Sequence, residues 1–179
     1  MAHAGDVGTE IAPEVADDPE LTARLDDLLH RTCHVARALT SAEQAAFKVD
    51  LGGDGHATRK FFNLSERYER WRDYRVDPRG RGLHGLDLAP GEVVRLTQAE
   101  VEAHPAWTAF GTQAAAHPPL RGWLASAVYG EDGRNYGLLQ LSDKAAGADF
   151  TAEDADRLRE LAAFTGATLD AFRAARRSA

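Results

Sequence analysis

The chain has 179 residues, 44% of them hydrophobic, which is enough for one well-filled core and short for two. Its 28 acidic and 21 basic residues give a formal net charge of −7, whereas a nucleic-acid surface needs a basic stripe that neutralises phosphates. The sequence has neither an apolar run near the roughly 20 residues that span a bilayer nor a signal-peptide start. We therefore expect one cytoplasmic domain that binds neither nucleic acid nor membrane.

The first part of the chain predicts a tail followed by a helix. Residues 1–19 are acidic, rich in Ala and Asp and without periodicity, as in a disordered tail. Residues 20–175 have the pattern of one folded domain, and 176–179 form a short basic end. The domain opens with apolar positions spaced alternately by four and three residues, which indicates one face of a helix. These positions are Leu21, Leu25, Leu28, Thr32, Val35 and Leu39.

The middle of the chain is less regular. Two strand-like runs, 45–51 and 56–64, flank the turn sequence Gly-Gly-Asp-Gly. A short helix and a loop are expected within 65–91, and a short strand at 92–97. Residues 98–119 form a helical stretch that prolines interrupt and then stop.

The last third has the clearest pattern. Two strand-like runs, Trp123–Tyr129 and Tyr136–Ser142, are joined by a Gly-containing loop and predict a hairpin. Thr151 and Asp154 have the spacing of a capping box that starts a long helix. The apolar stripe of that helix is Leu158, Leu161, Ala162, Thr165, Leu169 and Phe172. The elements together predict an α+β domain with an antiparallel sheet of five or six strands flanked by helices.

Three segments of the sequence carry a resemblance to a known family. They read VVRLTQAEVEAHPAW, HPPLRGWLASAVYGEDGRNYGLLQLSDK and FTAEDADRLRELAAFTGATLDAF. With them, residues 20–175 resemble GAF domains, especially those of actinobacterial sensor proteins that stand beside PAS and histidine-kinase or phosphatase modules. The resemblance implies a GAF-like fold related to profilin and PAS domains, and a sensory role in signal transduction of the two-component kind.

The sequence departs from the GAF domains whose ligands are best defined. Cyclic-nucleotide relatives carry Asn-Lys, Phe and Asp-Glu where this chain has Asp143-Lys144, Phe150 and Asp154-Ala155. Bilin-binding relatives need a positioned cysteine, and the single Cys33 lies on the first predicted helix. Relatives that reduce free methionine sulfoxide use several cysteines, because one thiol forms a sulfenic acid that another resolves. The sequence thus leaves both ligand and cofactor unidentified.

A ligand pocket is expected between the sheet and residues 65–120, where GAF domains build theirs. Aromatic side chains with a few polar groups are typical of such pockets. The candidate residues are Trp71, Tyr74, Trp107, Phe110, His117, Arg121 and Gln140. Arg121 is the expected anion-binding group, because it follows two prolines and offers a planar, permanently charged fork. The alternative is that the aromatic residues only cover one face of the sheet.

For the other polar residues that could form a site, the sequence predicts structural roles. His30 and His34 share a helix face, but two ligands leave a metal site incomplete, so we expect no metal there and a buried Cys33. Lys144 and Asp154 are expected to form a structural ion pair. The sequence suggests no catalytic set.

The leading hypothesis is a sensory domain that binds a small molecule or a signalling partner protein. Because both terminal helices carry apolar stripes, we expect it to signal through them in a homodimer. One alternative is a small-molecule enzyme of the redox type on the same scaffold, which a single cysteine disfavours. Another is a degenerate module that only dimerises and binds no ligand.

Overall fold

The computed structural model describes residues 19–50, 58–69, 82–108 and 120–178, so the predicted tail lies outside it apart from Pro19. Within the described part, five strands form one antiparallel sheet in the order β2-β1-β5-β4-β3. The strands are Ala42–Asp50 (β1), Thr58–Leu64 (β2), Val93–Thr97 (β3), Gly122–Tyr129 (β4) and Asn135–Lys144 (β5). The predicted antiparallel α+β sheet is confirmed, and so is the pairing of β4 with β5.

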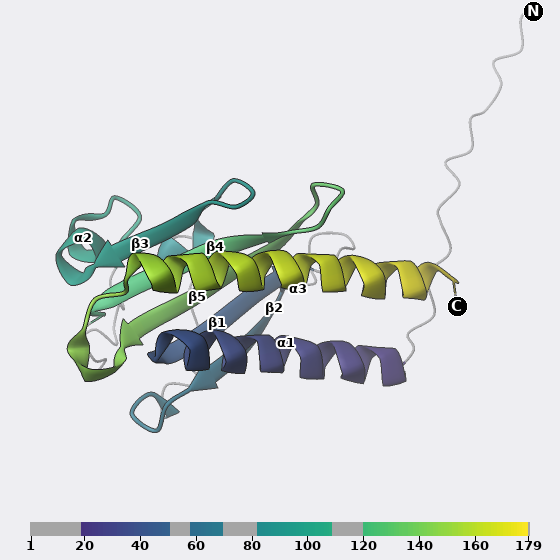
Figure 1. Cartoon of the computed structure of the whole chain (residues 1–179), viewed down its shortest axis with the longest axis horizontal. Helices are drawn as coiled ribbons and strands as arrows, with labels where there is room; N and C mark the ends of the chain where they lie inside the picture. Colours follow the sequence, from purple (N-terminus) through teal and green to yellow (C-terminus); the bar gives the residue numbers. More distant parts are fainter. Residues whose placement is uncertain (1–18, 51–57, 70–81, 109–119, 179) are drawn as a thin grey trace, which may run out of the picture.

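Two long helices form a layer on one face of the sheet. α1 (Pro19–Thr40) and α3 (Ala152–Ser178) lie side by side and run in opposite directions (Figure 1). The guanidinium of Arg157, near the start of α3, donates to the carbonyl of Leu39 at the end of α1 at 3.1 Å. α3 continues to Ser178, so most of the expected basic end belongs to this helix. None of the helices in the described part is long and apolar enough to cross a membrane.

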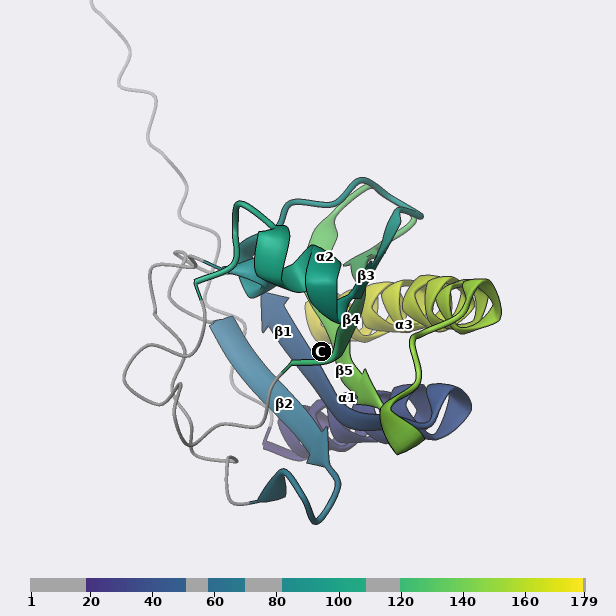
Figure 2. The same cartoon turned by 90° about the vertical axis from the view of Figure 1, so that its left-hand side faces the viewer.

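Short elements complete the fold. α2 (Gln98–Ala103) lies on the side of the sheet away from the long helices (Figure 2). Single 3-10 turns stand at Leu83–Gly85 (η2) and Ala145–Gly147 (η4).

Local side-chain chemistry starts α3. The Thr151 backbone N–H donates to the Asp154 carboxylate at 2.8 Å, and the Asp154 N–H donates to the Thr151 hydroxyl at 3.2 Å. This is the reciprocal capping box that the sequence predicts, with Asp in the place of Glu. It satisfies two backbone groups that the first turn of a helix leaves without partners.

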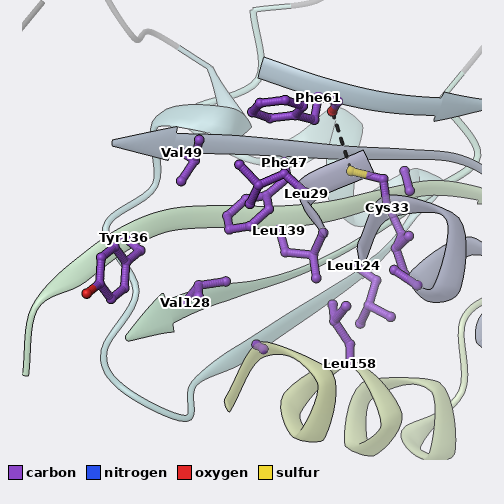
Figure 3. Close-up of a cluster of buried hydrophobic side chains, with 14 of the residues drawn as sticks. Leu29, Cys33, Phe47, Val49, Phe61, Leu124, Val128, Tyr136, Leu139 and Leu158 are labelled. Atoms are coloured by element: carbon purple, nitrogen blue, oxygen red, sulfur yellow. Dashed lines mark hydrogen bonds between the residues drawn. The ribbon is translucent and has the colours of Figure 1, made fainter. Parts of the chain in front are cut away.

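The main core lies between the sheet and the α1–α3 layer (Figure 3). Its fully buried residues include Leu29, Cys33, Phe47, Val49, Leu124, Val128, Leu139, Leu141, Leu158 and Leu169. The thiol of Cys33 faces the Phe61 carbonyl at 3.6 Å and is buried, as the sequence suggests. Cys33 therefore acts as a small apolar residue of the core.

The predicted apolar stripe of α1 needs a correction. Leu25 and Thr32 are buried, but Val35 and Leu39 are 39% and 44% exposed. The rest of the buried face consists of Leu29, Cys33, Ala36 and Thr40. Because apolar residues occupy adjacent positions at 28 and 29, two stripes one residue apart fit the helical period. The sheet selects the one whose small side chains allow close packing.

A second apolar cluster lies on the opposite face of the sheet. It joins Trp123, Ala125 and Ala127 of β4 to Leu138 of β5 and to Val101 of α2. Leu83 and Leu88, from the segment around η2, are also buried there. This face is therefore partly covered by the chain between β2 and β4.

Candidate functional site

The sheet face away from α1 and α3 presents its side chains in cross-strand rows. Directly paired residues of antiparallel strands point to the same face. One row runs Phe62, Ala46, Gln140, Ala125 and Val94, and the next runs Lys60, Lys48, Leu138 and Ala127. Alanines at the centre of this face leave room above the sheet.

A hollow of about 330 Å³ lies at the end of this face where β1 ends and β5 begins. The described residues that line it are Lys48, Asp50, His84, Gly85, Leu86, Ala127, Asn135, Gly137 and Leu138. Apolar walls with a few charged and amide groups are typical of small-molecule sites. The sequence pattern did not identify this lining, although a lysine inside the apolar strand β1 was the available signal.

The start of β5 contains a β-bulge that turns the Tyr136 side chain away from the face that bears the hollow. Tyr129 pairs with Asn135 and Val128 pairs with Gly137, so Tyr136 is the extra residue. Asn135 and Gly137 line the hollow, whereas Tyr136 packs in the core beside α3. Gly137 has φ +134, and a Cβ there would lie 1.9 Å from the Lys48 carbonyl oxygen. Only glycine fits this conformation and this close approach.

The β4–β5 hairpin is fastened to the C-terminal half of α3 by three hydrogen bonds. The Tyr136 hydroxyl donates to Asp170 at 2.6 Å, and the Glu131 backbone N–H donates to the same carboxylate at 2.7 Å. Arg173 donates to Asp132 at 2.7 Å. Burial and the bond to Asp170 raise the pKa of Tyr136. One hairpin therefore contacts both the hollow and the last helix.

A buried carboxylate, Asp143, organises the other end of β5. It accepts hydrogen bonds from the backbone N–H groups of Arg121 at 2.6 Å and Gly122 at 3.3 Å, and from the Tyr68 hydroxyl. Burial, followed by the bond to Asp143, raises the pKa of Tyr68 well above its usual value. These contacts join the segment after β2 to the start of β4.

The structure places the pocket residues suggested by the sequence in different surroundings. Trp71, Tyr74, Phe110 and His117 lie outside the described residues. Trp107 is partly buried and packs against the second cluster. Gln140 lies on the hollow's face of the sheet, and its side-chain oxygen is buried without a hydrogen-bond partner among the described residues. Neither residue lines the hollow described above.

Arg121 does not have the buried position that an anion-binding role predicts. The residue is exposed, and one of its guanidinium nitrogens lies 3.2 Å from where a Cβ on Gly147 would stand. Its side chain therefore extends toward the turn after β5. The chain direction at this point is set by backbone bonds to Asp143, which the sequence does not reveal.

Two structural groups complete the description. Lys144 donates to Asp154 at 2.5 Å, and the Asp154 side chain is 1% exposed. Burial alone would raise the pKa of Asp154, but hydrogen bonds from Lys144 and Thr151 outweigh it and hold the pKa below its usual value. His30 and His34 are exposed, and no three His, Cys, Asp or Glu side chains of the described residues gather as metal ligands would.

Solved structures of similar fold include a GAF domain, a domain of a sensor histidine kinase protein and an enzyme. The GAF domain of a phosphoenolpyruvate-protein phosphotransferase from Coxiella burnetii is 19% identical, with 87% of this chain and 92% of that one covered and a TM-score of 0.61. A domain of a two-component sensor histidine kinase protein from Sinorhizobium meliloti is 15% identical, with 87% and 98% covered and a TM-score of 0.57. The free methionine-R-sulfoxide reductase from Neisseria meningitidis is 25% identical, with 90% and 84% covered and a TM-score of 0.56.

These similarities extend over most of the chain and agree in overall fold. A family model described as GAF domain matches residues 22–170, which include every strand and most of both long helices. The chain therefore belongs to the GAF domain family.

Proposed function

We propose that this chain is a sensory GAF domain that binds a small molecule in the hollow and passes the event to α3 through the β4–β5 hairpin. One observation carries the proposal. The bulge in β5 lets the Asn135 side chain and the Gly137 backbone line the hollow and places Tyr136 against Asp170 of α3. The binding face and the terminal helix thus share one short segment of chain.

A ligand acts through differential contact with two conformations. A molecule that contacts Asn135 or Gly137 favours one position of the hairpin. Because Glu131 and Asp132 hold the same hairpin to α3, a shift of the hairpin changes the position or the strain of that helix. The output is then carried by the helix to a partner protein, as a sensor domain requires.

We further propose that the terminal helices form a homodimer interface. The sequence pattern offered Leu21, Leu25, Leu28, Leu158, Leu161 and Leu169 for this role. Leu25, Leu158 and Leu169 are buried in the domain's own core, and the other three are partly buried. In the described part of the helical layer, the large apolar side chains that remain exposed are Val35, Leu39 and Phe164, the last 68% exposed. Packing of this two-helix layer against a second copy would bury them in a four-helix arrangement.

The binding proposal is tested by a thermal-shift screen of small metabolites of every charge class. A ligand at about 100 times its dissociation constant adds about 2.7 kcal/mol to stability. Hydrogen exchange with and without the best compound then tests transmission. We expect protection to change in the β4–β5 hairpin and in the C-terminal half of α3. A compound that binds and leaves exchange in α3 unaltered would refute signalling by this route.

Sedimentation equilibrium tests the dimer. The Phe164→Ser variant is expected to weaken self-association, because it removes the most exposed large apolar side chain of α3. Ala163→Ser, at an exposed neighbouring position of the same helix, is the matched control. A wild-type protein that stays monomeric at high concentration would remove this part of the proposal.

A redox enzyme is the second candidate, favoured by the 25% identity to the methionine-R-sulfoxide reductase from Neisseria meningitidis. The state of Cys33 argues against it. Burial raises the pKa of the thiol to about 12, whereas a reactive cysteine needs accessible thiolate. We expect iodoacetamide to alkylate Cys33 at neutral pH only after unfolding. Thiol-dependent turnover of free methionine-R-sulfoxide that disappears in Cys33→Ala would instead establish the enzyme.

A further inference from the structure

We infer that the hollow takes a small carboxylate with an apolar body, whose charge is held by Lys48 and Lys60. The inference rests on the proposed small-molecule binding at this face and names the chemical class of the ligand. Three features support it: an opposed pair of lysines, the charge balance of the lining, and an apolar wall.

The two lysines are direct cross-strand partners. Lys48 of β1 pairs with Lys60 of β2, so both side chains point to the face that bears the hollow. Neither ammonium group forms a hydrogen bond or ion pair with the described residues. Desolvation and the charge of Lys48 lower the pKa of Lys60. Like charges in direct opposition are destabilising, and a bound anion would remove that cost.

The chain uses lysine sparingly, which makes the pair more informative. Its sequence contains three lysines among 21 basic residues, and the third, Lys144, is paired with Asp154. Two of the three thus stand opposite each other, and one of them, Lys48, lines the hollow. Lysine presents a compact ammonium with three donors, which suits a carboxylate.

The charge of the lining favours a single negative charge on the ligand. Asp50, two residues beyond Lys48 on β1, also lines the hollow and already makes an interaction of its own. With His84 counted as neutral, the charges of the lining residues Lys48 and Asp50 cancel. Lys60, which is exposed beside the lining as the cross-strand partner of Lys48, adds one positive charge. A carboxylate neutralises that charge, whereas a phosphate dianion would leave an excess next to Asp50.

The rest of the lining calls for an apolar body. Leu138 and Ala127 form the floor and Leu86 contributes a wall. These side chains offer no hydrogen bonds, so a ligand gains there only by burying carbon. A charged head beside Lys48 and a hydrocarbon body over Leu138 match the two halves of the hollow.

The test uses hexanoate, its neutral isostere hexanamide, and acetate, which lacks the body. An amine-reactive reagent labels the lysines, and mass spectrometry measures how much of each lysine is modified. The decrease in modification as the probe concentration rises gives the dissociation constant. We expect hexanoate to protect Lys48 and Lys60 but not Lys144. A charge-assisted contact predicts at least about tenfold tighter binding of hexanoate than of hexanamide. Acetate should bind more weakly than hexanoate.

Substitutions of the two lysines test whether Lys48 and Lys60 are responsible for hexanoate binding. Lys48→Met and Lys60→Met should each weaken hexanoate binding by about tenfold or more, and Lys48→Arg should retain it. Arg31→Met, on the exposed side of α1, is the control for loss of a surface cation. Circular dichroism and thermal melts verify that each variant folds, and the second lysine variant serves if the first does not.

The outcomes separate this inference from the proposed function. Equal binding of hexanamide and hexanoate, or of acetate and hexanoate, would overturn the ligand class while leaving small-molecule sensing intact. Absence of protection by all three probes would also overturn it, and the metabolite screen would still decide whether this face binds anything. Protection of all three lysines alike would show non-specific screening and would count against the inference.

Discussion

The hydroxyl of Tyr136 donates to the carboxylate of Asp170 at 2.6 Å and so joins the bulge of β5 to the last helix. Figure 3 shows Tyr136 at the end of the core, beyond Val128. Without the bulge, the alternation along β5 would place Tyr136 on the same face as Leu138. The irregular step is therefore what connects the two sides of the sheet.

Replacement of Tyr136 by Phe tests this connection. The change removes the hydrogen bond to Asp170 and keeps the ring, so we expect a loss of about 1 kcal/mol in the free energy of unfolding. Ligand binding at the hollow should persist while the hydrogen-exchange response of α3 decreases. Tyr129→Phe is the control for loss of a phenolic hydroxyl that does not bond to α3, because that hydroxyl donates to the Leu88 carbonyl and accepts from Asn135. Both variants are compared at saturating ligand. An undiminished α3 response in Tyr136→Phe would exclude this route.

Alkaline pH should destabilise the domain through Tyr68. The unfolded chain loses a phenolic proton near pH 10, whereas burial and Asp143 raise the pKa of Tyr68 in the folded state. The stabilisation is therefore complete below about pH 10 and is lost as the pH rises through the folded pKa. Urea unfolding from pH 8 upward should show a slope of up to about 1.4 kcal/mol per pH unit from this group. Tyr68→Phe should flatten the slope, and an unchanged slope would contradict the assignment.

Gly166→Ala tests how closely α3 approaches the hairpin, because two effects predict opposite changes in the free energy of unfolding. Helix propensity alone predicts that this change in α3 stabilises the protein by about 1 kcal/mol. In the fold, however, a Cβ on Gly166 would lie 1.9 Å from the Tyr129 carbonyl oxygen, so α3 must move away from the hairpin. We expect a net loss of about 1–3 kcal/mol in thermal or urea unfolding. Greater stability in the variant would show that α3 does not approach β4 so closely.

Asp154→Asn should be among the more damaging single changes. It leaves Lys144 without its partner and weakens the capping box, for an expected loss of about 2–4 kcal/mol. Because the folded pKa of Asp154 is depressed, its contribution is present above about pH 4 and is lost as the pH falls through the folded value. Glu153→Gln, which removes an exposed pair with Arg157, is the control and should cost less than about 1 kcal/mol. Equal losses in both variants would mean that burial of the pair contributes nothing.

Much of the fold follows from local sequence signals. The turn after Tyr129, the alternation of β4 and β5 and the Thr151–Asp154 cap depend on residues a few positions apart, so the sequence alone locates the hairpin and the start of α3. The boundaries of β1 and β2 are likewise within a few residues of the expected ranges.

The candidate site was less accessible to sequence reasoning. Arg121 fitted an anion-binding role because of the prolines before it, yet the residue is exposed, and its backbone N–H is bonded to Asp143, 22 residues away. Lys48 and Lys60 become neighbours only through the register of β1 with β2. The aromatic residues predicted a pocket formed by the middle of the chain, whereas the described hollow is lined mainly by β1, β5 and the segment around η2.

The sequence by itself determined the fold class, the hairpin, the helix cap and the single buried cysteine, because hydrophobic period and turn chemistry act over a few residues. Only the tertiary structure decided which face of α1 is buried, where Tyr136 points and which charges meet at the hollow. Those features depend on strand register and on contacts between residues far apart in the chain. A shift of one residue in register reverses the face on which every side chain of a strand lies, and no local pattern encodes that choice.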